Sequence, residues 1–250
     1  MTNRAVGYYL PINRYSFHIH GINSLDFIGV KLKITDKIGL VHSSQICKKL
    51  YMDFGVSTII DLGAGKNPQE KICSDLGVRQ LLIDLGYPES SSTRIQRRMI
   101  NILDFTSIEK AILEFTEGGV DAVVSIGNIE HLKREEGELL LNRVENWAKK
   151  LVIFETPNGF VHQGPVDNNI YQIHLSGWAP QDFYKRGYKV YGTTGLKILK
   201  KDSNKGQYKF PIRGMRLLDV LLSRILFAKY FPSLCFNFIA FKIIEYPGLA

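Results

Sequence analysis

The chain is short of the residues that mark secreted, metal-binding or membrane-spanning proteins. Its 250 residues include three cysteines, Cys47, Cys73 and Cys235, which are odd in number, scattered and without the spacing of a metal site. We therefore expect free thiols in a reducing compartment. The N-terminus lacks a charged-then-apolar signal pattern, and the apolar run 215–231 is too short and too often interrupted by charge to span a membrane. These absences predict a cytoplasmic chain.

The sequence also lacks a clear group of metal ligands, and one long segment lacks acidic residues. His18 and His20 have no surrounding group of Cys, His or carboxylates, so we expect no metal. Residues 185–216 hold ten Lys or Arg against a single acid, Asp202, in a chain of net charge +8. Such a stretch is either a solvated surface loop or a contact with nucleic acid, an anionic membrane surface or a phosphorylated substrate.

The most informative feature present is a glycine turn between an apolar run and a helix start. The apolar run 57–62 leads into the turn, which reads Asp61-Leu62-Gly63-Ala64-Gly65. Glycine lets a backbone take positive φ and lie against a ligand. Asn67, Pro68 and Glu70 then fit the N-cap, the first helical position and a capping box. The unpaired N–H groups of that helix start favour negative charge.

Two common cofactor classes do not fit this turn. A dinucleotide site needs a small third residue, but Pro68 stands there, and a phosphate-binding P-loop needs a Gly-Lys-Ser/Thr ending that is absent. Asp61 would repel a pyrophosphate, yet it can help to hold a cationic amino-acid group. Asp84 ends the second apolar run and can accept hydrogen bonds from both ribose hydroxyls. These preferences predict S-adenosylmethionine.

Apolar runs and helical patterns alternate along the chain, which predicts an α/β fold with a parallel sheet and helices on both faces. The expected strands are 57–62, 80–84, 99–103, 121–127, 150–155, 189–198 and 236–244. In such sheets ligands bind beyond the carboxyl ends of the strands.

Four motifs in order carry a family resemblance. They are the glycine turn, Asp84, Asn101-Ile102-Leu103-Asp104-Phe105, and 121–132, which ends in Glu-His-Leu. From about Val56 to Val190 the chain resembles the class I S-adenosylmethionine-dependent methyltransferases, nearest to their type 11 small-molecule group. One departure is Asn67, where many members carry a third glycine. The resemblance implies a Rossmann-like sheet of seven strands, the last of them antiparallel. It also implies cofactor contacts from Asp61, Gly63, Ala64, Gly65, Asp84, Leu85, Asp104, Phe105 and Ile126.

The resemblance also frames the domain organisation. We expect a single methyltransferase domain over 1–250. Its parts are an N-terminal cap segment at 1–55, a core at 56–198 and 236–250, and a basic and apolar helical insertion at 199–235. The apolar run in that insertion is a buried helix, a dimer contact or an interfacial helix, with burial as the first alternative.

Methyl transfer to a hydroxyl needs alignment and a group that removes a proton. His131 follows the fourth strand, and His174 lies in the long loop 159–179, so both are candidate general bases. His131 also has a structural alternative, because the Glu-His-Leu ending occurs in relatives with unrelated acceptors. Glu130 and Glu155 are weaker candidates.

We therefore expect transfer of a methyl group from S-adenosylmethionine to a small or medium organic acceptor, at oxygen. The fourth motif lacks the Asn/Asp-Pro-Pro-aromatic element of amino-directed base methyltransferases, and no catalytic cysteine is apparent. One alternative is an RNA methyltransferase that uses the basic segment 185–216, although nucleic acid is the weaker partner. Another is a non-catalytic, cofactor-binding partner subunit. The partners left open are an anionic membrane surface, with the chain peripheral to it, and a phosphorylated substrate; the oligomeric state is open.

Overall fold

The chain divides into two compact units, Met1–Gly39 and Leu40–Ala250. The computed structural model describes residues 26–27, 30–31, 42–166, 169–202, 208–212, 214–225 and 228–244. In the first unit, β1 (Asp26–Phe27) pairs with β2 (Val30–Lys31) in antiparallel fashion. The predicted cap segment 1–55 falls largely outside the described residues, as do His18 and His20.

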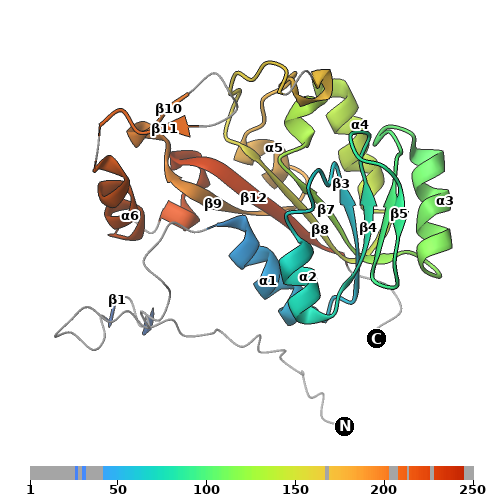
Figure 1. The fold of residues 1–250 in the computed structure, drawn as a ribbon. Helices are drawn as coiled ribbons and strands as arrows, with labels where there is room; N and C mark the ends of the chain where they lie inside the picture. Colours follow the sequence, from blue (N-terminus) through green and yellow to red (C-terminus); the bar gives the residue numbers. More distant parts are fainter. Residues whose placement is uncertain are drawn as a thin grey trace, which may run out of the picture. The chain divides into compact units, whose positions relative to one another are not determined.

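An eight-stranded sheet forms the centre of the second unit, in the order β5-β6-β4-β3-β7-β8-β12-β9 (Figure 1). Its strands are β3 (Thr58–Leu62), β4 (Arg79–Ile83), β5 (Ser90–Ser91), β6 (Ile95–Arg98), β7 (Val120–Ile126), β8 (Ala148–Pro157), β9 (Lys189–Leu196) and β12 (Cys235–Ile243). The run from β6 through β4, β3 and β7 to β8 is parallel throughout. The strands β5 and β12 run opposite to the other six strands of this sheet. This confirms the predicted Rossmann-like sheet, with its last strand inserted antiparallel between β8 and β9.

Helices cover both faces of the sheet because successive strand residues point to opposite sides. On β3, Ile60 and Leu62 face one apolar cluster and Ile59 faces the other. The first cluster is covered by α3 (Phe105–Phe115), α4 (Arg134–Val144) and α5 (Pro180–Tyr184). The second is covered by α1 (Ser43–Asp53) and α2 (Glu70–Leu76). Figure 1 shows α1 and α2 together on one side of the strands.

Two sequence predictions about this sheet were wrong in detail. The third parallel strand is 95–98 rather than 99–103. Ile100, Ile102 and Leu103 belong to the connection that follows and pack against the core from there. Their apolar composition is typical of a strand, although they form none. Between β4 and β6 the connection also contains β5, an eighth strand, where a helix was expected.

Asn67 does not cap the helix as predicted, because α2 begins at Glu70 with Gln69 as its N-cap. Asn67 instead adopts φ 59°, a positive value that is uncommon for a residue other than glycine. Its side-chain amide exchanges two hydrogen bonds with Gln80, of 3.2 and 3.1 Å. Asparagine tolerates the left-handed region better than most residues, which explains how it can stand at a position where the resemblance predicts glycine.

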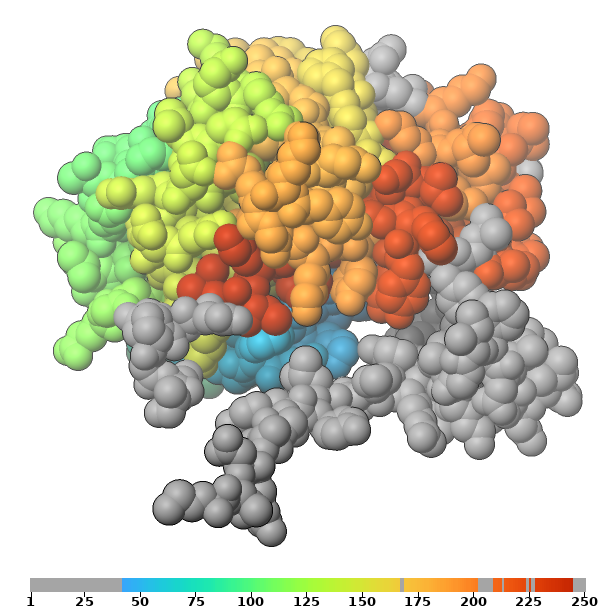
Figure 2. Space-filling view, turned by 180° about the vertical axis from the view of Figure 1, so that it is seen from behind, coloured from blue at the N-terminus to red at the C-terminus, as the bar shows by residue number. Residues whose placement is uncertain are grey.

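The segment between β9 and β12 contains a small hairpin and a helix at one end of the second unit (Figure 1). Figure 2 shows the orange and red atoms of this end from behind. Its elements are η3 (Lys197–Leu199), β10 (Lys201–Asp202), β11 (Tyr208–Lys209), α6 (Met215–Ile225), η4 (Ala228–Tyr230) and η5 (Pro232–Leu234). Asp219 attaches α6 to β9: its fully buried carboxylate accepts from the Leu196 N–H at 2.7 Å and pairs with Lys200.

Most apolar side chains of α6 point away from this attachment. The exposed ones are Leu217, Leu218, Leu221 and Ile225, at 71%, 42%, 53% and 59%. The first alternative for this run, a buried helix, is therefore wrong for most of its length. No helix within the described residues is long and apolar enough to cross a membrane.

Candidate functional site

The glycine turn lies at the carboxyl end of β3 and is fastened to the end of β4. The N–H groups of Gly63 and Ala64 donate to the Ile83 carbonyl, at 2.8 and 3.2 Å. Gly63 has φ 70°, and a Cβ placed on it would lie 2.2 Å from Asn128 Oδ1, so only glycine fits. Gly65 has φ 50°, and a Cβ there would meet nothing within 4 Å. The turn thus presents bare backbone to open space.

Asp84 joins this turn to the second strand. Its Oδ2 accepts from the Gly65 N–H at 2.8 Å, and its Oδ1 accepts from the Gly86 N–H at 2.6 Å. An ionised carboxylate has about four acceptor sites, so it can still receive hydroxyl donors. Leu85 follows, with 37% of its side chain exposed beside the turn. The structure therefore brings together two motifs that are separate in the sequence.

Asp61 is the most buried acid of the group. It is 1% exposed, and its Oδ2 has no hydrogen-bond partner among the described residues. Burial raises the pKa of this carboxyl to about 7, an effect that Arg97 opposes and Asp84 reinforces. Arg97 on β6 also has a buried nitrogen, Nη1, without a partner in the described part of the chain. Buried polar atoms without partners are costly, and a bound polar ligand would satisfy them.

The end of β7 borders the turn on its other side. Asn128 touches Gly63 and donates from Nδ2 to the Ser125 hydroxyl at 3.1 Å. That hydroxyl in turn donates to the Leu62 carbonyl at 3.2 Å. Ile126, the last residue of β7, is partly buried against the α1–α2 side of the core. These bonds fix the β7 end to the glycine turn.

Asp104 and Phe105 are placed differently from the other predicted residues. Both begin α3, where Asp104 is exposed and caps the helix by accepting from the N–H and hydroxyl of Ser107, at 3.1 and 2.7 Å. These hydrogen bonds lower the pKa of Asp104. Phe105 packs edge-on against Trp147, with ring centroids 5.9 Å apart. Contact of this pair with an adenine ring stays a prediction.

The two predicted histidines lie together, although they come from different segments. His131 ends η1 (Ile129–His131), directly after β7, and His174 belongs to the loop that follows β8. Their ring centroids are 4.8 Å apart in an edge-on arrangement. Glu130 completes the group, and one ligand atom from each of the three residues lies within 4.8 Å of the others.

Hydrogen bonds to the backbone hold both rings. His131 Nδ1 lies 3.2 Å from the Ile173 carbonyl, and His174 Nδ1 lies 2.6 Å from the Val161 carbonyl. Because a carbonyl only accepts, each Nδ1 carries the hydrogen and each neutral ring has its lone pair on Nε2. Burial lowers the pKa of His131, which favours that neutral form.

Glu130, one of the weaker candidates in the sequence, is buried beside the two histidines. It is 4% exposed, and its carboxylate accepts from the Thr156 hydroxyl at 2.9 Å. Burial raises its pKa to about 7. Glu155, the other weaker candidate, lies on β8 and accepts from the Thr193 hydroxyl at 3.3 Å, and it is not one of the three grouped residues. The Glu-His pair in the sequence was a signal for Glu130, but the contribution of Thr156 depends on strand pairing.

The loop 159–179 is packed onto α4 by a single aromatic residue. Trp178 is 1% exposed and donates to the Ser176 hydroxyl at 2.9 Å. A Cβ added at Gly137 on α4 would lie 2.4 Å from the Trp178 ring. Arg134 also lies over this ring, 3.8 Å from its centroid. This anchor positions the part of the loop that carries His174; Asn168 of the same loop lies outside the described residues.

No family model matches the sequence, and no curated protein matches it. Solved structures match its fold. A SAM-dependent methyltransferase from Archaeoglobus fulgidus is 12% identical, covers 80% of this chain and 94% of its own, and has a TM-score of 0.44. The plantazolicin methyltransferase BpumL with SAH is 14% identical over 81% and 82%, with a TM-score of 0.46. The DhpI–SAH complex is 11% identical over 80% and 82%, with a TM-score of 0.46.

These likenesses concern the fold, and the fold assignment rests on the strand order and pairing of the chain itself. The parallel run through β6, β4, β3, β7 and β8, with an antiparallel strand before the edge, is the fold that the resemblance to class I S-adenosylmethionine-dependent methyltransferases predicted.

Proposed function

We propose that the chain is an S-adenosylmethionine-dependent methyltransferase that methylates an oxygen atom of a small or medium organic acceptor. The observation that carries this proposal is the link between Asp84 and the Gly65 N–H, at 2.8 Å. It supports a ribose-binding role for Asp84, because the carboxylate lies beside a turn whose Gly65 faces open space. The buried Asp61, which has an oxygen without a partner among the described residues, adds a site for a cationic group.

The residues present fit the cofactor at each of its polar parts. Asp84 would accept from the ribose hydroxyls, the turn from Gly63 to Gly65 would lie against the amino-acid portion, and Asp61 would face its ammonium group. Leu85 and Ile126 would contribute apolar contact beside the base. When bound, the cofactor supplies an activated methyl group on a positively charged sulfur.

The Glu130–His131–His174 cluster is proposed to act on the acceptor. Glu130 and His131 follow β7 within three residues of Asn128, which itself contacts the glycine turn, and the loop after β8 brings His174 to them. In the transfer, the acceptor oxygen forms a bond to the methyl carbon, the carbon–sulfur bond breaks, and its electron pair stays on sulfur. The hydroxyl proton needs a base, and a neutral imidazole is suited to take it.

Replacing Asp84 by Ala tests the cofactor site. We expect the affinity for S-adenosylhomocysteine, measured by calorimetry, to fall by roughly 1–3 kcal/mol, because hydrogen bonds to a charged acceptor are lost. Asp75→Ala on α2 is the matched control, since that carboxylate is solvent-exposed at 43% and only loosely paired with Lys48 and Lys71. An unchanged dissociation constant for Asp84→Ala would contradict the ribose assignment.

The alternatives differ in measurable ways. An RNA methyltransferase should bind RNA with a steep salt dependence. Part of the basic segment is already committed, because Arg186 pairs with Glu138, Lys200 pairs with Asp219, and Lys197 donates to the Asn158 carbonyl at 2.5 Å. This weakens the RNA alternative. A non-catalytic subunit would bind cofactor tightly and turn over no acceptor.

We also propose that α6 and its neighbours rest on an anionic bilayer. The exposed leucines of this helix lie beside the exposed cations Lys201, Lys209 and Arg216. Apolar side chains next to Lys and Arg are the combination that binds such a surface. The acceptor would then be lipid-linked or amphipathic.

A further inference from the structure

Three side chains of metal-ligating type meet where β7 and the loop after β8 adjoin. The ligand atoms of Glu130, His131 and His174 lie within 4.8 Å of one another. A tetrahedral zinc-type site holds nitrogen and oxygen ligands at about 2.0–2.2 Å, so its ligand atoms are ~3.4 Å from one another. The three ligand atoms, now within 4.8 Å, would therefore have to approach one another by up to about 1.4 Å to hold an ion.

Each member of the cluster is oriented by a partner outside it. The three bonds are Thr156 Oγ to Glu130 Oε2 at 2.9 Å, His131 Nδ1 to the Ile173 carbonyl at 3.2 Å, and His174 Nδ1 to the Val161 carbonyl at 2.6 Å. Metal-binding histidines almost always donate their other ring N–H to a carbonyl or carboxylate, and ligating carboxylates are themselves hydrogen-bonded. The arrangement has this form for all three residues.

The burial of Glu130 points the same way. It is 4% exposed, and none of the ion pairs found among the described residues involves its carboxylate, which accepts from the Thr156 hydroxyl. His174 is also buried, at 7%. A buried carboxylate is normally paired with a cation or coordinated to a metal, because leaving it alone is costly.

We propose that Glu130, His131 and His174 bind one divalent first-row transition cation. Three protein ligands leave coordination positions open, which is typical of catalytic rather than structural sites. On the proposed function, an open position would receive the acceptor oxygen next to the methyl group. The cation would favour loss of the hydroxyl proton to water and would take the place of an imidazole base, because both Nε2 lone pairs would then be ligands. The sequence predicted no metal, because the ligands come from segments that only the fold brings together.

The donor set also predicts which ions bind. Imidazole nitrogens suit zinc, cobalt, nickel and iron, whereas magnesium prefers an all-oxygen shell. We therefore expect Co²⁺ and Zn²⁺ to compete for the cluster and Mg²⁺ at similar concentration not to displace them.

The test uses the full chain, with any affinity tag removed and the protein treated with a chelator. It is titrated with Co²⁺ in the absence of cofactor, and the visible absorption and the metal content after gel filtration are measured. We expect one Co²⁺ per chain. Glu130→Gln and His174→Gln should lower the affinity at least about tenfold. His162→Gln changes an exposed histidine of the same loop and should leave it unchanged.

Failure to bind Co²⁺ in the unmodified chain would overturn the proposal, as would equal affinity in Glu130→Gln and His174→Gln. Circular dichroism shows whether each variant folds. If one does not, Thr156→Val is used in its place; it removes only the hydrogen bond from Thr156 to Glu130 and should also weaken Co²⁺ binding. Calorimetry with S-adenosylhomocysteine on the same samples separates the two proposals. Co²⁺ binding without S-adenosylhomocysteine binding would reject the methyltransferase function and support the metal site. Binding of S-adenosylhomocysteine without Co²⁺ would reject the metal site and support the cofactor site.

Discussion

Burial of the Asp61 carboxyl lowers the free energy of unfolding of the chain at neutral pH. Its pKa is raised to about 7, mainly by burial, from an ordinary value of about 4 in an unfolded chain. A carboxyl with a raised folded-state pKa contributes its full stability below pH ~4. That contribution is lost as the pH rises toward 7, because the unfolded chain releases the proton first.

Asp61→Asn should therefore raise the unfolding temperature at pH 8 and have little effect at pH 4. A gain of 1 kcal/mol corresponds to about 2–4 °C in a chain of this size. The same change should weaken cofactor binding, since the negative charge is gone. Thermal unfolding followed by circular dichroism at both pH values checks the first part. Asp75→Asn is the control, and identical pH profiles for Asp61→Asn and the unmodified chain would contradict the argument.

Residues of the candidate site could be predicted from the sequence where they stand in a short local pattern. Gly63, Gly65 and Asp84 stand in short patterns whose backbone requirements are visible in the sequence. Arg97, which influences the pKa of Asp61, comes from another strand, so no local pattern marks it. The Asn67–Gln80 amide pair is equally non-local.

Among the elements, those with a clear period were predicted well and those with an ambiguous apolar run were not. The ends of β3, β4, β7 and β12 fall within about two residues of the predicted bounds. The run around Ile100 to Leu103 failed because a core-packing connection and a strand have the same apolar composition. The β5 edge failed because two exposed serines carry no periodic signal.

The packing of the 159–179 loop onto α4 gives a prediction at this scale. Gly137→Ala would normally stabilise a helix interior by up to about 1 kcal/mol. Here the added Cβ would lie 2.4 Å from the Trp178 ring, so overpacking of ~1–3 kcal/mol should outweigh that gain. We expect a lower unfolding temperature, measured by calorimetry. Gly164→Ala is the control, because a Cβ there meets nothing within 4 Å; a stabilised Gly137→Ala protein would show that Trp178 does not anchor the loop.

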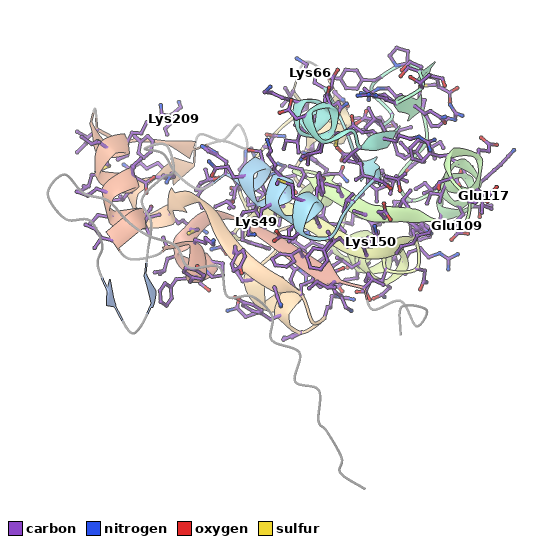
Figure 3. All side chains as sticks on the ribbon, turned by 90° about the horizontal axis from the view of Figure 1, so that it is seen from below. Lys49, Lys66, Glu109, Glu117, Lys150 and Lys209 are labelled. Atoms are coloured by element: carbon purple, nitrogen blue, oxygen red, sulfur yellow. The ribbon has the colours of Figure 1, made fainter. Side chains whose placement is uncertain are left out.

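At one end of the second unit, the exposed apolar side chains of α6 belong to the same segment as exposed basic residues. Figure 3 shows Lys209 beside α6, at the opposite end of this unit from Glu109 and Glu117. The basic and apolar composition of 199–235 is visible in the sequence. It could not predict that Asp219 would point inward and leave the leucines outward, because this depends on the buried partners supplied by β9 and Lys200.

This asymmetry predicts that vesicles containing an anionic phospholipid co-sediment the protein, that neutral vesicles do not, and that added salt reduces the bound fraction. Leu217, Leu221 and Ile225 share one face of α6 because they are spaced by four residues. Changing all three to Ser should lower vesicle binding at least about tenfold, since each buried leucine contributes roughly 1.5–3 kcal/mol when fully covered. Leu113→Ser with Leu139→Ser removes equally exposed leucines from α3 and α4 and should have no effect. If the triple variant instead loses only self-association in gel filtration, this face is a contact between two copies of the chain. If it binds vesicles as well as the unmodified protein does, α6 plays no part in membrane binding.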